Sequence, residues 1–205
     1  MARPHRQGPP GEPGLSAGGG APGRGEPDRL PVLAAPPFHL RGFEDRDVPM
    51  VAEAASDPLI LLASSVPAAA GEAGARQFVR DQQHRLGDGF GYSFVIADDV
   101  GDRAVGSIGL WLRDLDLGRA SVGYWVLGSA RRRGAASAAL RAVVRWALLD
   151  LGVARLELAV EPHNTASTRT AERAGFVLEG LLRSWQVVGA ERRDVYLYSL
   201  LRSDL

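Results

Sequence analysis

A basic stretch of small residues stands between a strand-like run and a helix-like run in the middle of the chain. It reads Arg131-Arg132-Arg133-Gly134-Ala135-Ala136-Ser137 and follows the apolar run 121–127. After it, apolar residues recur every three or four positions as far as Leu149, a spacing that predicts an amphipathic helix. Strand and helix therefore meet at this loop, which requires a fold that mixes the two.

The start of this predicted helix is a candidate anion site. The first amides of a helix have no partners inside it and lie at the positive end of its dipole, so the amides of residues 133–137 can point at phosphate oxygens. Gly134 and Ala136 let a phosphate come close. The pattern Arg-x-x-Gly-x-Ala lacks the Gly-Lys-Ser/Thr ending of a Walker loop. A pyrophosphate site is one interpretation, and the solvated start of an ordinary helix is the other.

A second segment, Glu161-Pro162-His163-Asn164-Thr165-Ala166-Ser167, leads into a short helix followed by Gly175-Phe176. Together the two segments resemble the acetyl-CoA site of the GNAT acyltransferases. In that superfamily the Arg-x-x-Gly-x-Ala loop takes the pyrophosphate of coenzyme A, and an Asn-x-x-Ser helix lies along the pantetheine arm. The resemblance implies acetyl-CoA as co-substrate. The implied cofactor-binding residues are Val126, Leu127, Arg131, Arg132, Arg133, Gly134, Ala135, Ala136, Ser137, Asn164 and Ser167.

The resemblance extends beyond these two segments. Gly123-Tyr124-Trp125-Val126 before the loop, residues 175–180 after the short helix and residues 194–200 near the end look like the Rim-type (RimJ/RimL-like) branch. Its named members acetylate the N-termini of ribosomal proteins. The resemblance covers residues 38–201 and implies a protein N-terminus, possibly ribosomal, as the acceptor. It is compatible with a monomer or a homodimer.

Runs of apolar residues broken by turn-rich segments predict the secondary structure. The expected strands are 39–43, 92–97, 104–112, 119–127, 156–160, 177–185 and 194–201, and the expected helices follow Asp45 or Asp47 and span 69–85, 136–149 and 165–174. Residues 92–127 should form an antiparallel meander whose third strand pairs in parallel with 156–160. The apolar run 59–62 is expected to contact the core or form a lid. The predicted class is α/β, a GNAT-like mixed, mostly antiparallel sheet with helices on both faces and, by resemblance, a diverging central parallel pair.

Length and composition predict one domain. With 205 residues and 45% hydrophobic content, the chain fills one core. Residues 1–37 contain eight glycines and nine prolines without apolar periodicity, so we expect a disordered tail there and a single domain over 38–205. The tail has no secretory h-region, and no later apolar run reaches membrane-spanning length. These features predict a cytoplasmic protein without a membrane partner.

Several chemistries are excluded by composition. The chain has no cysteine, which excludes disulfides and an acyl-cysteine intermediate, and its four histidines show no metal-ligand spacing. We therefore expect no metal. The formal net charge is zero, so the chain lacks the excess positive charge that is typical of a nucleic-acid-binding protein.

Acetyl transfer to an amine needs a held thioester, a donor for the carbonyl oxygen and a route for the amine's proton. By resemblance the backbone amides of Val126 and Leu127 meet the pantetheine and the acetyl oxygen. Asn164 is either a helix N-cap alone or also a site residue. Ser167 can cap the same turn, protonate the departing thiolate, or do both. Glu161, through water, is a candidate end point for the amine's proton.

His163 is a possible base by position, with a structural role as the alternative. Two positions depart from related sequences: Ser121 stands where Rim-type sequences often have Glu, and Ala171 where many relatives have Tyr. Neither side chain takes a proton well near neutral pH. An α-amine needs less help from a base than a lysine amine does, because its pKa is lower. This favours an α-amine acceptor.

Three functions follow from these features. The first is an N-acetyltransferase that acts on a protein N-terminus by direct attack on the thioester. The second is the same chemistry on a small amine such as an aminoglycoside, a polyamine or an amino acid derivative. The segments expected to form the walls of the acceptor site, 59–66 and 185–191, hold no dense carboxylate cluster, which argues against polycationic acceptors. The third is a non-catalytic coenzyme A-binding sensor, which Ser121 and Ala171 would permit.

Overall fold

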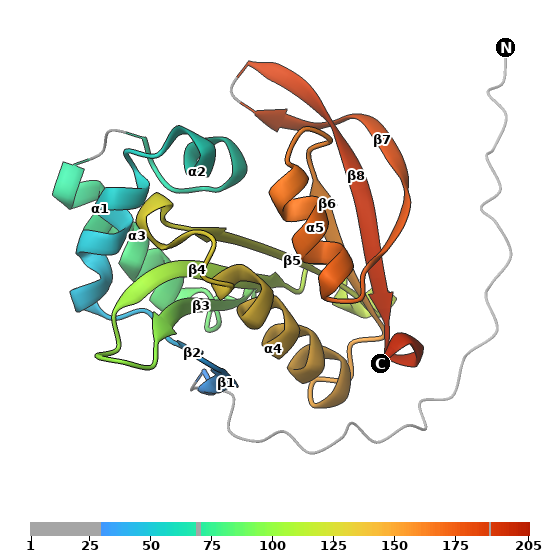
Figure 1. Ribbon diagram of the computed structural model, residues 1–205, viewed down its shortest axis with the longest axis horizontal. Coiled ribbons are helices and arrows are strands. Elements are labelled where there is room, and N and C mark those ends of the chain that lie inside the picture. Colours follow the sequence, from blue (N-terminus) through green and yellow to red (C-terminus); the bar gives the residue numbers. More distant parts are fainter. Residues whose placement is uncertain (1–29, 69–70, 189) are drawn as a thin grey trace, which may run out of the picture.

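The computed structural model describes residues 30–68, 71–188 and 190–205. They build one eight-stranded sheet with the spatial order β1-β2-β3-β4-β5-β6-β8-β7 (Figure 1). The strands are β1 (Leu33–Ala35), β2 (Phe38–Arg41), β3 (Gly91–Asp98), β4 (Ala104–Trp111), β5 (Arg119–Val126), β6 (Arg155–Val160), β7 (Val177–Val188) and β8 (Glu191–Leu201). Neighbouring strands are antiparallel except β5 and β6, which are parallel.

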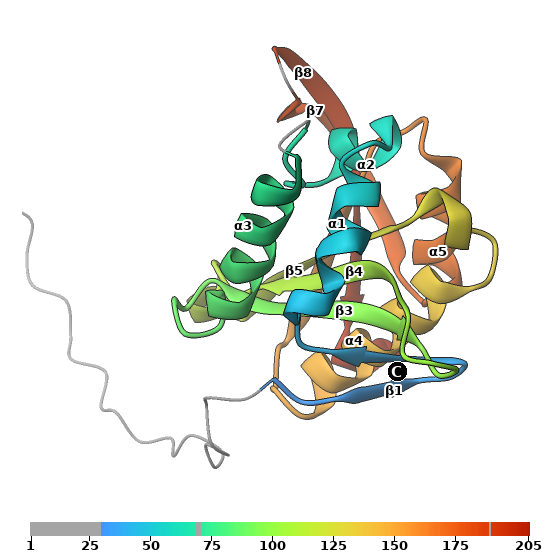
Figure 2. The same cartoon turned by 90° about the vertical axis from the view of Figure 1, so that its left-hand side faces the viewer.

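Helices cover both faces of this sheet. They are α1 (Val48–Ala54), α2 (Pro58–Ala63), α3 (Gly71–His84), α4 (Ala135–Leu149) and α5 (Thr165–Arg173). The helices α1, α2 and α3 lie on one face, and α4 and α5 lie on the other (Figure 1, Figure 2). This arrangement confirms the predicted α/β class with a mixed, mostly antiparallel sheet.

The two central parallel strands separate soon after they begin. β5 and β6 pair only as far as Ser121 opposite Glu157. β5 continues to Val126 and β6 to Val160 without further pairing between them. The predicted diverging pair is therefore confirmed, and a gap opens in the middle of the sheet toward the loop that leads into α4.

The helix α4 is held on the sheet by the apolar face that its spacing predicted. Leu140, Val143 and Ala147 are fully buried, and the helix contacts β1, β2, β4, β5 and β6. Ala136, which was expected on this face, is only partly buried at the first turn. Burial of the rest of the face fixes the N-terminus of α4 beside the gap.

The predicted boundary between tail and domain at residue 37 needs correction. Residues 1–29 lie outside the described residues, but Leu33–Ala35 form β1, which pairs with β2 in the register Leu33 to Leu40. Ala35 is buried. The prolines on either side of β1 hid it in the sequence, yet proline is tolerated beside a short edge strand because an edge leaves some backbone donors unpaired.

Other elements differ from prediction in their ends. The apolar run 59–62 is part of a helix, α2, whose N-cap Asp57 accepts a hydrogen bond from Leu59 N at 3.0 Å. The helix expected over 69–85 is described from residue 71 to 84, since residues 69 and 70 lie outside the described residues. Both strands of the last hairpin extend closer to its tip than predicted.

The aspartate predicted to cap α1 has a different partner. Asp47 occupies the N-cap position, but its side chain does not bind the amides of α1. Its two oxygens accept hydrogen bonds from Arg41 Nη1 and Nη2, both at 2.8 Å, and one also accepts from Glu44 N. Arg41 and Asp47 are both buried, so each charge is compensated by the other rather than by water.

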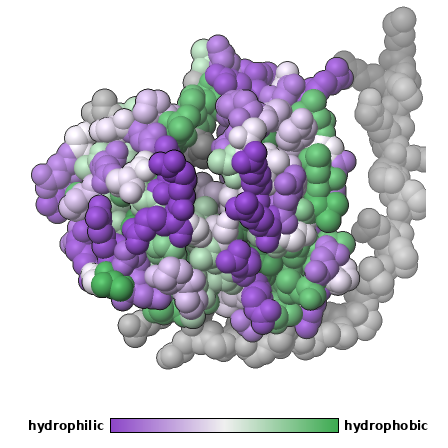
Figure 3. Space-filling view, viewed as in Figure 1, coloured by the Kyte–Doolittle hydropathy of each residue, from purple (hydrophilic) through white to green (hydrophobic). Residues whose placement is uncertain are grey.

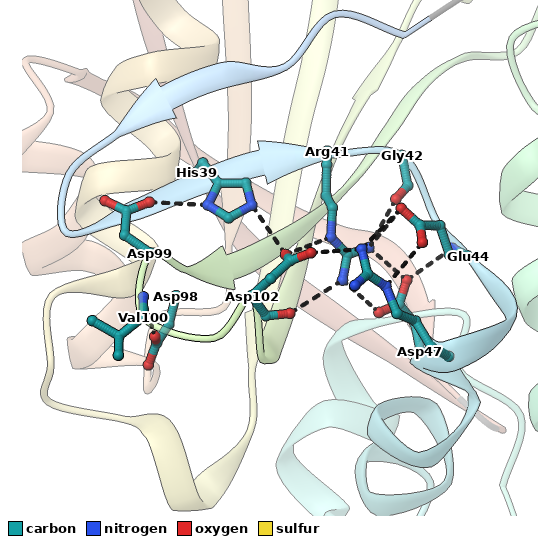
Figure 4. Close-up of polar contacts among 10 residues, drawn as sticks. His39, Arg41, Gly42, Glu44, Asp47, Asp98, Asp99, Val100 and Asp102 are labelled. Carbon is teal, nitrogen blue, oxygen red and sulfur yellow. Dashed lines mark hydrogen bonds and ion pairs between the residues drawn. The ribbon is translucent and has the colours of Figure 1, made fainter.

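Asp102, in the turn between β3 and β4, extends this ion pair to His39 (Figure 4). Its Oδ1 accepts from Arg41 Nε at 2.8 Å and lies 3.0 Å from His39 Nε2. The hydrogen bond to Asp47 is the largest of the contacts that raise the pKa of Arg41 above its ordinary value. The network ties β2 to the β3–β4 turn and to the start of α1.

Candidate active site

The loop between β5 and α4 has a backbone suited to an anion. The φ angles of Arg132 and Gly134 are 63° and 84°, both in the left-handed region. Left-handed residues in a loop turn neighbouring N–H groups toward one concave side, where an anion can bind. Gly134 adopts this conformation without steric cost and is the N-cap of α4.

The first amides of α4 have no acceptor inside the helix. The first helical hydrogen bond runs from Ala138 N to Gly134 O at 3.0 Å. The N–H groups of Ala135, Ala136 and Ser137 precede it and lie at the positive end of the helix dipole. The structure thus places these three predicted residues where their amides can receive phosphate oxygens.

Two of the three loop arginines hold carboxylates. Arg131 Nη2 lies 2.6 Å from Asp57 Oδ2, and Arg133 Nη2 lies 3.0 Å from Asp98 Oδ2. The hydrogen bond from Arg133 lowers the pKa of Asp98 below its ordinary value. Arg132 has no ion-pair partner within the described part of the chain. A phosphate at this loop would therefore compete with two carboxylates.

The end of β5 corrects one predicted contact. Leu127 donates its N–H to Val105 O at 3.0 Å, so that amide is used in the pairing with β4. Alternate residues of a strand direct their backbone groups to opposite edges, which turns the N–H of Val126 toward the gap between β5 and β6. Val126 O accepts a hydrogen bond from Arg131 Nε at 3.2 Å. Of the two amides predicted to meet acetyl-CoA, only that of Val126 points toward the gap, because that of Leu127 is used in the pairing with β4.

Asn164 and Ser167 lie together at the start of α5. Asn164 Oδ1 accepts a hydrogen bond from Ser167 N at 3.0 Å, which confirms the predicted N-cap. The hydroxyl of Ser167 is 2.8 Å from the hydroxyl of Tyr124, a β5 residue, so this hydrogen bond joins β5 to α5. Burial raises the pKa of Tyr124 above its ordinary value, and the phenol keeps its proton at neutral pH.

Tyr124 is a site residue that the sequence did not single out. Its only signal was its place in Gly123-Tyr124-Trp125-Val126. The contact with Ser167 joins residues 43 positions apart, and nothing in the local sequence indicates it.

Glu161 lies just after β6 and has partners away from Ser167. Its Oε2 is 3.4 Å from His163 Nε2 and 3.6 Å from Arg193 Nη1. Its carboxylate is mostly buried, whereas the ring of His163 is largely exposed. Among the described residues no hydrogen bond joins the carboxylate to Ser167. The structure therefore groups Asn164 with Ser167 and leaves Glu161 in an ion cluster with β8.

The two positions that depart from related sequences have ordinary structural roles. Ser121 is an exposed residue of β5 opposite Glu157. Ala171 is fully buried under α5, and its carbonyl accepts a hydrogen bond from Phe176 N at 3.1 Å. Because Ala171 has no exposed surface, a larger side chain there would have to displace its neighbours.

A cavity of about 430 Å³ opens on the other face of the sheet. Residues from α2, from α3 and from the far part of β7 form its walls, and the middle of β4 and β5 forms its floor. Figure 1 shows the far end of β7 and the adjacent start of β8 rising beside α2, and Figure 3 shows a hollow between α2 and α5 with hydrophilic residues on both sides. The cavity lies on the α2 and α3 side, and α4 begins on the opposite side.

The floor of the cavity carries an aromatic ring over two glycines. Gly109 and Gly123 face each other across β4 and β5. A Cβ atom at either glycine would lie 3.1 Å from the ring of Trp111, so a side chain at either position would push the ring away by a few tenths of an ångström. Arg85 stacks over this ring, 4.8 Å from guanidinium carbon to ring centroid.

The described residues give no indication of a metal centre or a membrane span. Within 30–68, 71–188 and 190–205, no group of three or more His, Asp or Glu side chains could hold a metal ion. No helix in the same ranges is long and apolar enough to cross a bilayer.

Comparison with known proteins gives consistent matches. A family model described as the acetyltransferase (GNAT) domain matches residues 38–177. An uncharacterised N-acetyltransferase of Bacillus licheniformis, p20, is 28% identical over 165 residues, which cover 80% of this chain and 93% of that protein.

Solved structures show the same architecture. RimJ of Mycobacterium smegmatis, in complex with coenzyme A disulfide, is similar with a TM-score of 0.75 and 25% identity; the match covers 88% of this chain and 90% of that one. RimL, the α-N-acetyltransferase of ribosomal protein L7/L12, is similar with a TM-score of 0.72 and 18% identity, over 83% of this chain and 98% of that one.

Proposed function

The chain belongs to the GNAT acetyltransferase family and is an acetyl-CoA-dependent N-acetyltransferase, and on that premise we propose that its acceptor is the α-amine of a protein N-terminus. The observation that carries the proposal is the composition of the cavity. No carboxylate and no histidine are among its described lining residues. A strong base that would deprotonate the acceptor is therefore missing from these walls.

An α-amine needs such a base least. With a pKa near 7.7–8.0 it is roughly a third neutral at pH 7.5, whereas a lysine amine near 10.4 is only about 0.1% neutral. The neutral fraction is the nucleophile, so a site without a base favours the α-amine by more than two orders of magnitude. The described walls also lack the acidic surface that a polycationic amine would require.

The relatives support a protein acceptor. RimL acts on the N-terminus of ribosomal protein L7/L12, and this chain shares its fold. A ribosomal protein is therefore our first candidate for the acceptor. In our proposal the domain that carries the activity includes β1, from Leu33, and does not begin at Phe38, because β1 belongs to the sheet.

We assign the pyrophosphate of acetyl-CoA to the start of α4. The amides of Ala135, Ala136 and Ser137 and the left-handed backbone at Gly134 suit two phosphates. Arg132 is available, and Arg131 and Arg133 would exchange their carboxylates for phosphate oxygens. Acetyl-CoA then supplies an activated acetyl thioester in the gap between β5 and β6.

The groups around the gap are placed to assist direct attack of the acceptor amine on the thioester. The Val126 N–H donates to the acetyl oxygen, where negative charge develops. The acceptor nitrogen bonds to the acetyl carbon while the carbon–sulfur bond breaks, and the sulfur takes its proton from the Ser167 hydroxyl. Tyr124, which is protonated at neutral pH, returns a proton to Ser167, and the phenolate that this leaves regains a proton from water. The acceptor's surplus proton passes to water, with Glu161 as a second recipient.

The test is release of the coenzyme A thiol from acetyl-CoA in the presence of three acceptor classes. These are peptides with free N-termini, matched N-blocked peptides that carry lysine, and small amines such as a polyamine and an aminoglycoside. We expect turnover on free N-termini at a rate at least 100-fold above that on the lysine peptides, from the difference in neutral fraction.

Two outcomes would contradict the proposal. Faster turnover of lysine peptides than of free N-termini would show that the site does supply a base. Turnover confined to small amines would move the activity to metabolite modification. Acetyl-CoA binding measured by calorimetry on the same preparation confirms that a silent peptide panel is not due to an empty cofactor site.

A further inference from the structure

One cation in the cavity, which we propose receives the acceptor and call the acceptor cavity, has no counter-charge among the described residues. Arg85, just after α3, is the only charged residue among the described residues that line the cavity. None of the described carboxylates forms an ion pair with it. Burial lowers the pKa of its guanidinium, and no neighbouring charge opposes that shift. A partly buried cation without an anion costs free energy, which an anionic ligand would recover.

The guanidinium is nevertheless held in one orientation. It stacks on Trp111 and donates from Nη1 to Gln82 Oε1 at 2.9 Å. The same oxygen accepts the Ser93 hydroxyl at 2.8 Å, and Gln82 is 8% exposed. Stacking and this hydrogen bond fix the plane of the fork, so its remaining N–H groups are preorganised for a planar anion.

Gln82 orients Arg85 and is not needed as a ligand donor itself. Because Arg85 can only donate, the oxygen of the Gln82 amide must face it, which turns the amide nitrogen the other way. The other described residues that line the cavity carry no charge. The pocket therefore combines a fixed guanidinium with an aromatic face, and a guanidinium fork suits a carboxylate.

We propose that Arg85, seated on Trp111 and oriented by Gln82, is a carboxylate-binding subsite that makes the enzyme prefer N-termini with Asp or Glu at the second or third residue. The inference rests on the proposed function, because it places the acceptor amine at the end of β5. It adds a sequence preference to that function.

The spacing along β5 decides which carboxylate can reach the subsite. The ring of Trp111 covers Gly123, three residues before Val126, which is roughly 10 Å along the strand. A peptide advances at most about 3.3–3.6 Å per residue, so a side chain at its second or third position spans this distance. The α-carboxylate of a free amino acid is two bonds from its amine and cannot bridge it.

The experiment measures kcat/KM for coenzyme A release with matched peptides. One series carries Glu at the second or the third position, a second carries Gln there, a third carries Lys, and free glutamate is added as a small acceptor. We expect the enzyme to prefer the better-placed Glu peptide over its Gln counterpart by about ten-fold or more. The variant Arg85→Gln should lose this preference and keep its rate on the Gln peptides, and Arg85→Glu should prefer Lys peptides.

Arg80→Gln is the matched control, since Arg80 lies on the same helix, α3, on its exposed side and outside the cavity. Its preference should equal that of the unmodified enzyme. Equal rates on Glu and Gln peptides, or a preference that survives Arg85→Gln, would overturn the subsite and leave N-terminal acetylation intact. Faster turnover of free glutamate than of the Glu peptides would show that the carboxylate bound at Arg85 belongs to a small acceptor and not to a peptide. No turnover of any peptide with a free N-terminus, whether it carries Glu or Gln, would refute the proposed function itself, and the subsite with it.

Discussion

At the scale of single residues, our proposal assigns protonation of the departing thiolate to the hydroxyl pair between β5 and α5. Ser167 is oriented twice, because its amide is bound by Asn164 and its hydroxyl by Tyr124. A serine alone is a poor acid, with no charge nearby to release its proton. The buried phenol of Tyr124 can replace that proton at once, which makes the pair a better donor than either hydroxyl alone.

Removal of the Ser167 hydroxyl should slow the acetyl transfer step. We expect Ser167→Ala to lower kcat by about 100-fold, as for loss of a general acid, with little change in acetyl-CoA affinity. Tyr124→Phe should lower kcat less, by about ten-fold, because Ser167 can still donate. Steady-state rates and calorimetric Kd values on the same variants separate the two effects.

Thr165→Ala provides the comparison, since it also removes a hydroxyl from the first turn of α5 but at an exposed position. Its kcat should match that of the unmodified enzyme. If Ser167→Ala weakens acetyl-CoA binding and leaves kcat unchanged, Ser167 is a binding residue and the proton must come from water.

Glu179 on β7 makes the stability of the sheet dependent on pH. Arg155 binds both of its oxygens, and the hydroxyl of Ser199 donates to Oε1 at 2.6 Å. These contacts, with the hydrogen bonds from Arg155 first, lower the pKa of Glu179 from 4.5 to about 2. The folded state therefore binds this proton less readily than the unfolded state does, and the stabilisation is present above pH 4.5 and lost as the pH falls toward 2.

Glu179→Gln should consequently lower the free energy of unfolding at pH 7, and this loss should become progressively smaller below pH 4.5. Urea unfolding of both proteins between pH 7 and pH 2.5 measures this as a converging difference in the free energy of unfolding. A difference that stays constant across that range would mean that the charge of Glu179 contributes nothing and that only its shape matters.

At the scale of elements, α2 and the cofactor loop share one aspartate. Asp57 caps α2 through Leu59 N and holds Arg131 through its other oxygen. One carboxylate therefore links a wall of the acceptor cavity to the proposed pyrophosphate site. A phosphate that takes Arg131 releases Asp57 from the loop but leaves its cap intact.

Asp57→Asn tests this competition, because asparagine is an equally good N-cap without the charge. We expect acetyl-CoA to bind two- to five-fold more tightly to this variant, the factor that loss of a partly exposed ion pair allows. The Kd from calorimetry at low ionic strength is the measurement. Asp57→Ala removes the cap as well, so it should also raise the KM for the peptide. Weaker binding of acetyl-CoA by Asp57→Asn would show that Asp57 orients Arg131 for the phosphate instead of competing for it.

The sequence predicted these elements where local patterns determine them. The meander, α4 and β6 followed from alternation, helical spacing and turn residues between 91 and 160. β1 was missed because two of its neighbours are Pro36 and Pro37, and α2 because four consecutive apolar residues carry no periodicity. β1 depends on its pairing with β2 and its contacts with α4, and α2 contacts β5, so packing in the fold rather than local propensity selects both structures.

The candidate site divides in the same way. The loop before α4 and the Asn164 cap are local arrangements, so their motifs predicted the backbone that is observed, and pyrophosphate binding at the loop stays a proposal. The contact between Tyr124 and Ser167 and the stack of Arg85 on Trp111 join separate parts of the chain and require the folded sheet. The free amide of Val126, as opposed to that of Leu127, depends on which edge each residue of β5 faces, and only the observed pairing with β4 fixes that.

At the scale of the whole molecule, our proposal places the two substrates on opposite faces of the sheet. The loop before α4 lies on one face, the cavity proposed for the acceptor lies on the other, and β5 and β6 separate between them. The chain has no cysteine that would store an acetyl group. Transfer should therefore occur only when both substrates are bound at once.

This architecture predicts sequential kinetics. Initial rates at several fixed peptide concentrations, plotted as double reciprocals against acetyl-CoA, should give intersecting lines rather than the parallel lines of a ping-pong reaction. Incubation of the enzyme with acetyl-CoA and labelled coenzyme A, without peptide, should give no labelled acetyl-CoA, because no acetylated enzyme forms to react back. Exchange of label at a rate near kcat would instead require a covalent acetyl intermediate on a hydroxyl, with Ser167 as the nearest candidate, and Ser167→Ala would then abolish the exchange.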